Sequence, residues 1–131
     1  MHELRHDAQS LCAFATSLLQ RAGVRDDIAR DVAEVLVDAD LMGHTTHGLA
    51  LLAAYLDQLA KGAMRPSGEP LVVTRHPASQ LWDAQRLPGP WVTRRAFDRA
   101  SAMAGVQGTA TIVIRRSHHI ACLAAYLPAI V

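Results

Sequence analysis

The residues best suited to chemistry lie in one short stretch, Asp40-Leu-Met-Gly-His-Thr-Thr-His-Gly-Leu49. It places two histidines, two threonines and two glycines between two segments with helical apolar spacing. A helix-to-helix connection needs only a glycine or two to turn, so the imidazoles and hydroxyls exceed what the turn requires. Imidazole exchanges protons near neutral pH. We therefore interpret this stretch as part of a functional site.

A second polar group, Ser117-His118-His119, directly follows the apolar, β-branched segment 109–114. That segment is typical of a buried strand, and ligands of α/β sheets collect outside the carboxyl ends of strands. Arg115 and Arg116 add positive charge, which would favour an anionic substrate or a phosphate. Position alone makes this group the second candidate site element.

In the first stretch, Thr46 is a natural N-cap for a helix over residues 46–61. His47 would then occupy the first helical position, beside unpaired backbone N–H groups that favour a neutral imidazole and a bound carboxylate. Gly48 would let a ligand come close. Such a histidine can donate a hydrogen bond to a carbonyl oxygen or take a proton from a hydroxyl group.

Other chemistries fit less well. His44 and His47 have a spacing that can suit a metal, but Asp40 is the only nearby carboxylate and no cysteine is close, so no metal site is expected. Ser117 lacks the G-x-S-x-G context of a hydrolase nucleophile. The chain contains neither G-x-G-x-x-G nor a P-loop motif. His44 is expected to be structural.

The elements that must position these residues can be read from apolar spacing. It predicts three N-terminal helices, the first two forming an antiparallel hairpin, over residues 7–22, 26–41 and 46–61. After a Pro- and Gly-rich loop the order becomes β-β-α-β-α, over residues 71–74, 80–83, 91–104, 109–114 and a final helical segment. The fold class is therefore α/β with an N-terminal three-helix layer. We expect a helical region over 1–65 and the start of an α/β region over 66–131.

Composition narrows the function classes. The 131 residues are 50% hydrophobic with a net charge of +1, which is typical of a globular domain and excludes a basic nucleic-acid-binding surface. The N-terminus does not resemble a signal peptide, and the apolar runs are too short to span a bilayer. Cys12 and Cys122 belong to no C-x-x-C pair, as expected for reduced thiols in the cytoplasm. The apolar run ending at Val131 predicts the first part of a larger protein, the alternative being a docked C-terminal helix.

Both polar stretches resemble a known family. The pattern Asp40-x-x-Gly43-x-x-Thr46-His47-Gly48, followed by Tyr55 and Gly62, resembles the signature of the malate/L-lactate dehydrogenase family. This group includes ureidoglycolate dehydrogenase and diketogulonate reductase. Ser117-His118-His119 resembles the S-N-H element of the same family. The resemblance covers essentially the whole chain, but only the N-terminal part of a family member.

The resemblance implies a homodimeric oxidoreductase with a non-Rossmann fold, which interconverts 2-hydroxy acids and 2-oxo acids with NAD or NADP. His47 and His119 would be the catalytic residues. The resemblance also implies substrate contacts from Thr46, Gly48, Ser117 and Arg116, and cofactor contacts from His118 and His119. It does not settle which histidine transfers the proton.

The chain departs from the family pattern at three positions. Leu51 replaces an arginine that often holds the substrate carboxylate, Ala121 replaces a glycine, and His118 replaces an asparagine. Arg115, Arg116 or the N-terminus of the third helix would then have to hold the carboxylate. These residues alone should lack a complete cofactor site and activity. The alternative function is a non-catalytic helical module that serves dimerisation or folding.

Overall fold

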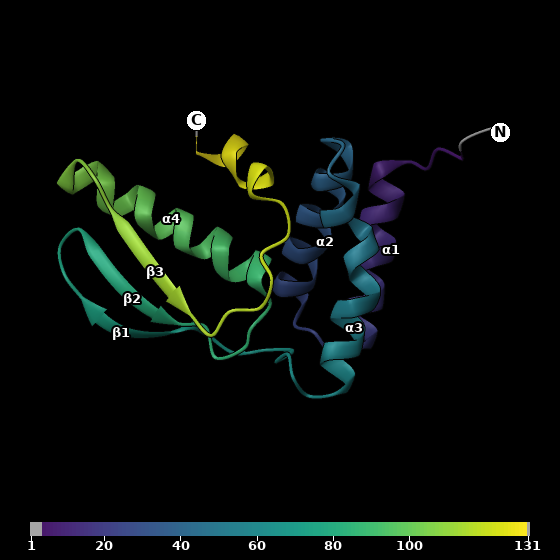
Figure 1. Ribbon diagram of the computed structural model, residues 1–131, viewed down its shortest axis with the longest axis horizontal. Coiled ribbons are helices and arrows are strands. Elements are labelled where there is room, and N and C mark those ends of the chain that lie inside the picture. Colours follow the sequence, from purple (N-terminus) through teal and green to yellow (C-terminus); the bar gives the residue numbers. More distant parts are fainter. Residues whose placement is uncertain (1–3, 131) are drawn as a thin grey trace.

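The computed structural model describes residues 4–130 and consists of a helical layer beside a three-stranded sheet (Figure 1). The first two helices, α1 (Ala8–Arg21) and α2 (Asp26–Leu41), form the expected hairpin. Asp7 caps α1 by accepting a hydrogen bond from the Ser10 backbone N–H at 2.8 Å. Gly23 follows α1 with a φ of +87°, a left-handed conformation that glycine adopts without strain.

The connection to the third helix differs from the expectation. Two 3₁₀ turns, η1 (Thr45–His47) and η2 (Leu49–Leu51), precede α3 (Leu52–Ala60). The prediction that Thr46 caps an α-helix and that His47 starts it was therefore wrong. The physical cause is a long-range contact, because the Asp40 carboxylate accepts the backbone N–H of Leu49 at 2.8 Å and holds the chain in tight turns. His47 is thus not placed at the positive end of a long helix.

The sheet contains three strands in the order β1-β2-β3. Strands β1 (Leu71–Arg75) and β2 (Ser79–Asp83) are antiparallel, as two successive strands joined by a short turn allow. Helix α4 (Gly89–Gln107) then crosses to β3 (Thr111–Arg115), which pairs with β2 in parallel. The predicted β-β-α-β order is confirmed, although α4 begins at Gly89, before the expected start at residue 91.

Two further expectations need correction. Strand β3 was expected to be buried, but Thr111, Val113 and Arg115 are exposed because only one face of the sheet is covered by α4. The final helical segment is a 3₁₀ helix, η3 (Leu123–Ala129), which contains Pro128. Proline has no N–H for an α-helical hydrogen bond, so a regular helix is disfavoured there.

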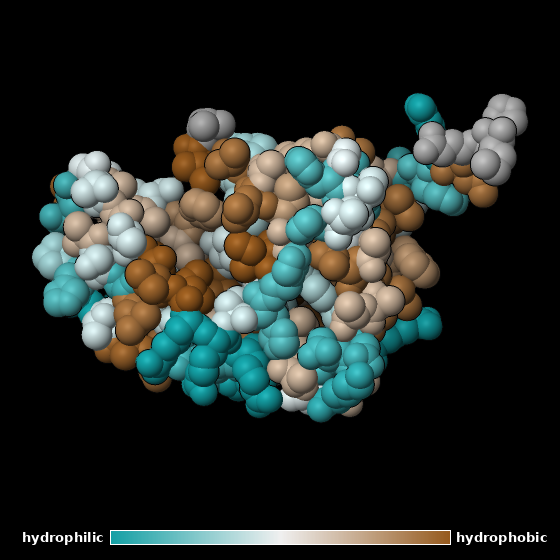
Figure 2. Space-filling model, in the orientation of Figure 1, coloured by the Kyte–Doolittle hydropathy of each residue, from teal (hydrophilic) through white to brown (hydrophobic). Residues whose placement is uncertain are grey.

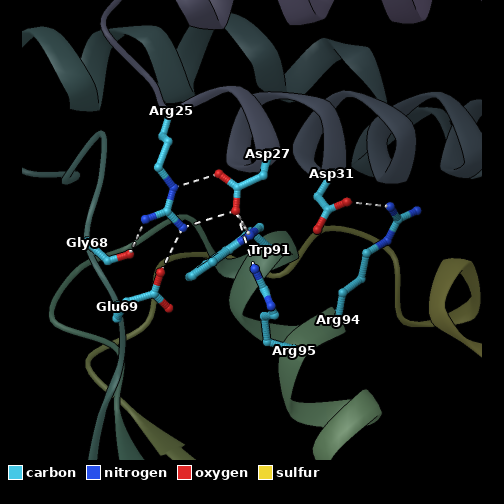
Figure 3. A network of polar contacts seen from close by, with 8 residues as sticks. All are labelled: Arg25, Asp27, Asp31, Gly68, Glu69, Trp91, Arg94 and Arg95. Carbon is cyan, nitrogen blue, oxygen red and sulfur yellow. Dashed lines mark hydrogen bonds and ion pairs between the residues drawn. The ribbon is translucent and has the colours of Figure 1, made fainter.

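A polar network connects the N-terminal ends of α2 and α4 (Figure 3). The fully buried Trp91 donates its indole N–H to Asp27 at 3.1 Å. The guanidinium groups of Arg25 and Arg95 lie 5.1 Å and 5.0 Å from the centre of its ring, within cation–π range. Arg25 also pairs with Glu69 at 3.0 Å, in the loop before β1. These contacts fix the helical layer to the sheet.

The apolar core is continuous from the helical layer to the sheet and includes Ile28, Leu36, Trp82 and Trp91. The expected division at residues 65 and 66 stays a prediction. Apolar residues also gather on the surface over the sheet, where Figure 2 shows a brown area. On β3, Val113 is 55% exposed. Within residues 4–130, no helix has the length and apolar character needed to cross a membrane.

Candidate functional site

Two histidines that are distant in sequence lie together in the structure. The ring of His47, at the end of η1, has its centroid 5.5 Å from that of His119, in the loop after β3. The two rings are tilted by 31° relative to each other, and both residues are exposed. This is the pairing that the family resemblance implied for the candidate catalytic residues.

Each imidazole has one nitrogen held by a neighbouring group. His47 Nδ1 lies 2.9 Å from the Thr46 hydroxyl, and His119 Nδ1 accepts the backbone N–H of Ala121 at 3.1 Å. From residue 4 to residue 130, no hydrogen bond reaches the Nε2 atom of either ring. Both Nε2 atoms are therefore available to a ligand.

A shallow pocket of about 420 Å³ borders His47 and the residues that follow His119 in the chain. Its volume falls within the range typical of small-molecule sites. None of its described lining residues is a lysine or an arginine; the pocket is formed by His44, His47, Ala121, Cys122, Leu123 and Ala124. Cys122 is a buried free thiol, and the expected structural His44 also lines the pocket.

The structure explains why residue 48 is a glycine, which the sequence alone did not reveal. A β-carbon at this position would lie 2.1 Å from Asp40 Oδ1, so a side chain cannot fit unless the carboxylate moves. Gly48 is buried, and its lack of a side chain makes room for the Asp40 carboxylate. The Asp40 and Gly48 positions of the motif thus act together to shape the turns that carry His47.

The two arginines after β3 are engaged away from the histidines. The side chain of Asp83 is only 2% exposed and pairs with Arg116 at 2.9 Å and Arg115 at 3.0 Å. Hydrogen bonds from Arg116, together with the Gln85 backbone N–H and Arg115, lower the pKa of the Asp83 carboxyl group. Arg116, expected at the substrate, is thus bound to Asp83, and so is Arg115.

Ser117 and His118 also make internal contacts. The Ser117 hydroxyl donates to the backbone carbonyl of His118 at 2.9 Å. His118 Nε2 lies 2.8 Å from the carbonyl oxygen of Ala63, and because a carbonyl only accepts, Nε2 must carry the hydrogen. The half-buried His118 therefore joins the loop after β3 to the loop after α3, rather than extending toward the His47 ring.

Three residues that sequence analysis did not place at the site support the His119 loop. The buried Tyr55 donates its hydroxyl to the His119 carbonyl at 3.0 Å, and Tyr126 donates to the next carbonyl, of Ile120. A β-carbon at Gly89 would lie 2.3 Å from the same His119 carbonyl oxygen. Tyr55 belongs to the family-like motif, whereas neither Tyr126 nor Gly89 carried a sequence signal.

A second cleft, of about 360 Å³, lies between α2, α4 and η3 and contains neither His47 nor His119. Arg94, one of the charged residues that line it, is already paired with Asp31 at 3.0 Å and also with Glu34. The histidine pocket offers ring nitrogens without partners, and we therefore assign the candidate site there.

The fold of this chain is shared with solved structures of dehydrogenases. It is similar to the malate dehydrogenase of Pyrococcus horikoshii, with a TM-score of 0.93 and 28% identity over 96% of this chain and 36% of that chain. The sulfolactate dehydrogenase of Methanocaldococcus jannaschii gives a TM-score of 0.90 and 26% identity over 94% of this chain and 36% of that one.

Among curated relatives, the 2,3-diketo-L-gulonate reductase of Mannheimia succiniciproducens is 31% identical over 81% of this chain and 32% of its own length. Hydroxycarboxylate dehydrogenase B of Escherichia coli O157:H7 is 28% identical over 88% of this chain and 32% of its own length. The malate/L-lactate dehydrogenase family model matches residues 6–131, and the chain belongs to that family. It spans about a third of the length of these relatives.

Proposed function

We propose that the protein carrying this chain is an oxidoreductase that uses NAD or NADP to interconvert a 2-hydroxy acid and a 2-oxo acid. The observation that supports it is the His47–His119 pair, with both Nε2 atoms unpartnered within residues 4–130. Membership of a family of hydroxy acid dehydrogenases supports the same reaction class. The proposal includes a homodimer, as the family resemblance implies, and a location in the cytoplasm, as expected from the two cysteines that belong to no C-x-x-C pair.

We expect the described residues to supply only part of a dinucleotide site. The pocket beside the histidines is open and holds about 420 Å³, and no lysine or arginine of the described chain lines it to meet phosphate groups. A bound nicotinamide would supply or accept the hydride. The contribution of this chain is to hold and polarise the reacting oxygen and to manage its proton.

A small oxo acid can be oriented by the two imidazoles. The Nε2 atoms of His47 and His119 are the groups able to hydrogen-bond the reacting oxygen from this chain. The carboxylate needs a different partner, because Leu51 is apolar and packed against the core, while Arg115 and Arg116 bind Asp83. The Thr46 hydroxyl, which contacts His47 Nδ1, is an uncharged group of the same turn that can donate a hydrogen bond.

The proposal is tested by following consumption of reduced nicotinamide with a panel of 2-oxo acids. His47→Ala and His119→Ala should each lower kcat by roughly 100-fold, as loss of an acid/base or polarising group does. His76→Ala is the matched control, because His76 is exposed in the β1–β2 turn. Unchanged turnover in both site variants would exclude the proposed roles.

A result with no nicotinamide consumption for any oxo acid, together with concentration-dependent dimerisation, would instead favour the non-catalytic helical module. Calorimetric titration with NAD and NADP separates the two cases. The oxidoreductase binds at least one of them, whereas the helical module binds neither.

A further inference from the structure

The ring of His119 is held in one protonation pattern by a backbone group. The Ala121 N–H donates to Nδ1 of His119 at 3.1 Å. An imidazole nitrogen that accepts a hydrogen bond carries no hydrogen of its own, so the neutral ring must carry its hydrogen on Nε2. Nε2 has no hydrogen-bond partner among residues 4–130, which leaves a free N–H donor beside His47.

The backbone that provides this contact is strained and firmly held. Ala121 has a φ of +58°, a left-handed conformation that is rare for residues other than glycine. Strain of this kind persists only where the surrounding structure fixes it. Two buried tyrosines fix the turn by donating hydrogen bonds to consecutive backbone carbonyls. The Tyr55 hydroxyl donates to His119, and the Tyr126 hydroxyl donates to Ile120. The backbone of Gly89 packs directly against the same turn.

We propose that Tyr55, assisted by Tyr126, is a positioning residue that locks His119 in the Nε2–H tautomer, so that His119 polarises the substrate oxygen without exchanging a proton. The role of His119 toward the substrate oxygen rests on the proposed function, whereas the tautomer of its ring does not. A neutral histidine that polarises a carbonyl group is an established catalytic arrangement.

The proton then comes from His47. Its Nδ1 contacts the Thr46 hydroxyl, which can either donate or accept, so His47 can exist in either neutral tautomer or as the cation. A bound reduced nicotinamide would supply a hydride to the carbonyl carbon, and the π electrons of the carbonyl group would move to the oxygen. That oxygen takes the proton from Nε2 of the His47 cation, which becomes neutral, and His119 keeps its hydrogen throughout.

The tautomer can be measured on this chain without substrate or cofactor. In protein with ¹⁵N-labelled histidine, long-range ¹H–¹⁵N correlation spectra distinguish rings with hydrogen on Nε2 from rings with hydrogen on Nδ1. We expect only the Nε2–H form for His119 in the wild type. Tyr55→Phe should introduce a detectable fraction of the Nδ1–H form, and Tyr55→Phe combined with Tyr126→Phe a larger one.

Val32→Ala is the control for a general loss of stability, because Val32 is fully buried on α2 and is not hydrogen-bonded to the turn. It should leave the His119 spectrum unchanged. Detection of the Nδ1–H form of His119 in the wild type would contradict the proposal that the ring is held in the Nε2–H tautomer, even if no variant folds. An unchanged Nε2–H spectrum in the folded tyrosine variants would overturn the role of Tyr55. Neither result depends on whether the protein oxidises nicotinamide, so the two proposals can fail separately.

Discussion

Gly48 lies directly against the carboxylate of Asp40, so closely that a β-carbon would sit 2.1 Å from Oδ1 and 2.3 Å from Cγ. The other carboxylate oxygen accepts the backbone N–H of Leu49 at 2.8 Å. This contact joins the end of α2 to the turns that carry His47. The position of a candidate catalytic ring therefore depends on the absence of a side chain at residue 48.

Gly48→Ala should lower the free energy of unfolding by about 2 kcal/mol, because the added methyl group forces the Asp40 side chain away from Leu49. Urea denaturation measures the loss. In a double-mutant cycle with Asp40→Ala, the combined loss should be clearly smaller than the sum, since the second substitution removes the clash. Additive losses would show that the two residues do not interact as described.

Gly43→Ala is the control for backbone strain alone. Gly43 has a φ of +80°, but a β-carbon there would meet no atom within 4 Å. Its cost should be about 1 kcal/mol, the usual penalty for a left-handed non-glycine residue. That cost should be the same with or without the Asp40→Ala substitution.

Local patterns predicted most of the fold correctly. The apolar periodicity of α1 and α2 and the β-β-α-β order both depend on neighbouring residues, and the structure agrees with them. The start of α3 was misplaced because the bond between Asp40 and Leu49 links residues nine positions apart and overrides helix propensity. The exposure of β3 depends on how many layers cover the sheet, which strand composition does not encode.

The candidate site was predicted in part. Motif order identified His47 and His119, and the structure brings their rings together. Motif order could not show that Arg116 would bind Asp83, because the position of an arginine next to a histidine in the sequence does not determine which carboxylate it pairs with in the fold. The contacts of Tyr55 and Gly89 with the His119 carbonyl could not be predicted from the sequence either, since they connect elements that are distant along the chain.

Two glycines of the same helix should respond in opposite directions to alanine. At Gly89 the new β-carbon would lie 2.3 Å from the His119 carbonyl oxygen, and backbone atoms cannot rotate away. Gly89→Ala should therefore cost about 3 kcal/mol by overpacking. At Gly105 no atom lies within 4 Å, so Gly105→Ala should stabilise α4 by up to about 1 kcal/mol.

Thermal unfolding followed by circular dichroism measures both glycine variants. Gly89→Ala should also change the chemical shifts of the His119 ring, whereas Gly105→Ala should not. Equal effects of the two substitutions would contradict the close packing of α4 against the His119 turn.

Replacement of Ala121 tests the strained turn itself. Ala121→Gly relieves about 1–2 kcal/mol of left-handed strain, but loses about 0.8 kcal/mol of methyl burial and a further 0.5–1 kcal/mol, roughly, to chain entropy. The net change should lie near zero. Ala121→Val places a β-branched residue at a φ of +58°, and should cost about 2 kcal/mol or more.

Chemical denaturation of the two Ala121 variants gives the comparison. Both keep the backbone N–H at residue 121, so any variant that folds with the same turn should retain the Nε2–H form of His119. Stability of the valine variant equal to that of the wild type would mean that residue 121 does not adopt the left-handed conformation.

The Trp91 network predicts an acid-sensitive contribution to stability. The hydrogen bond from Arg25, aided by Arg25's charge and bonds from Ile28 and Trp91, lowers the pKa of Asp27 from 3.8 to about 2 despite partial burial. A group with a lowered folded-state pKa stabilises the protein above its unfolded pKa and loses that effect as pH falls toward the folded value. The loss should therefore occur between about pH 4 and pH 2. Because the Asp27 side chain is 39% exposed, we expect the loss of unfolding free energy to be only about 1 kcal/mol.

The unfolding free energies of wild type and Asp27→Asn should converge over this pH range. Asp57→Asn is the control, because it makes an equal charge change at an exposed ion pair on α3, and its unfolding free energy should follow the wild-type pH dependence. If the difference in unfolding free energy between wild type and Asp27→Asn stayed constant from about pH 4 to about pH 2, the carboxylate of Asp27 would not stabilise the network.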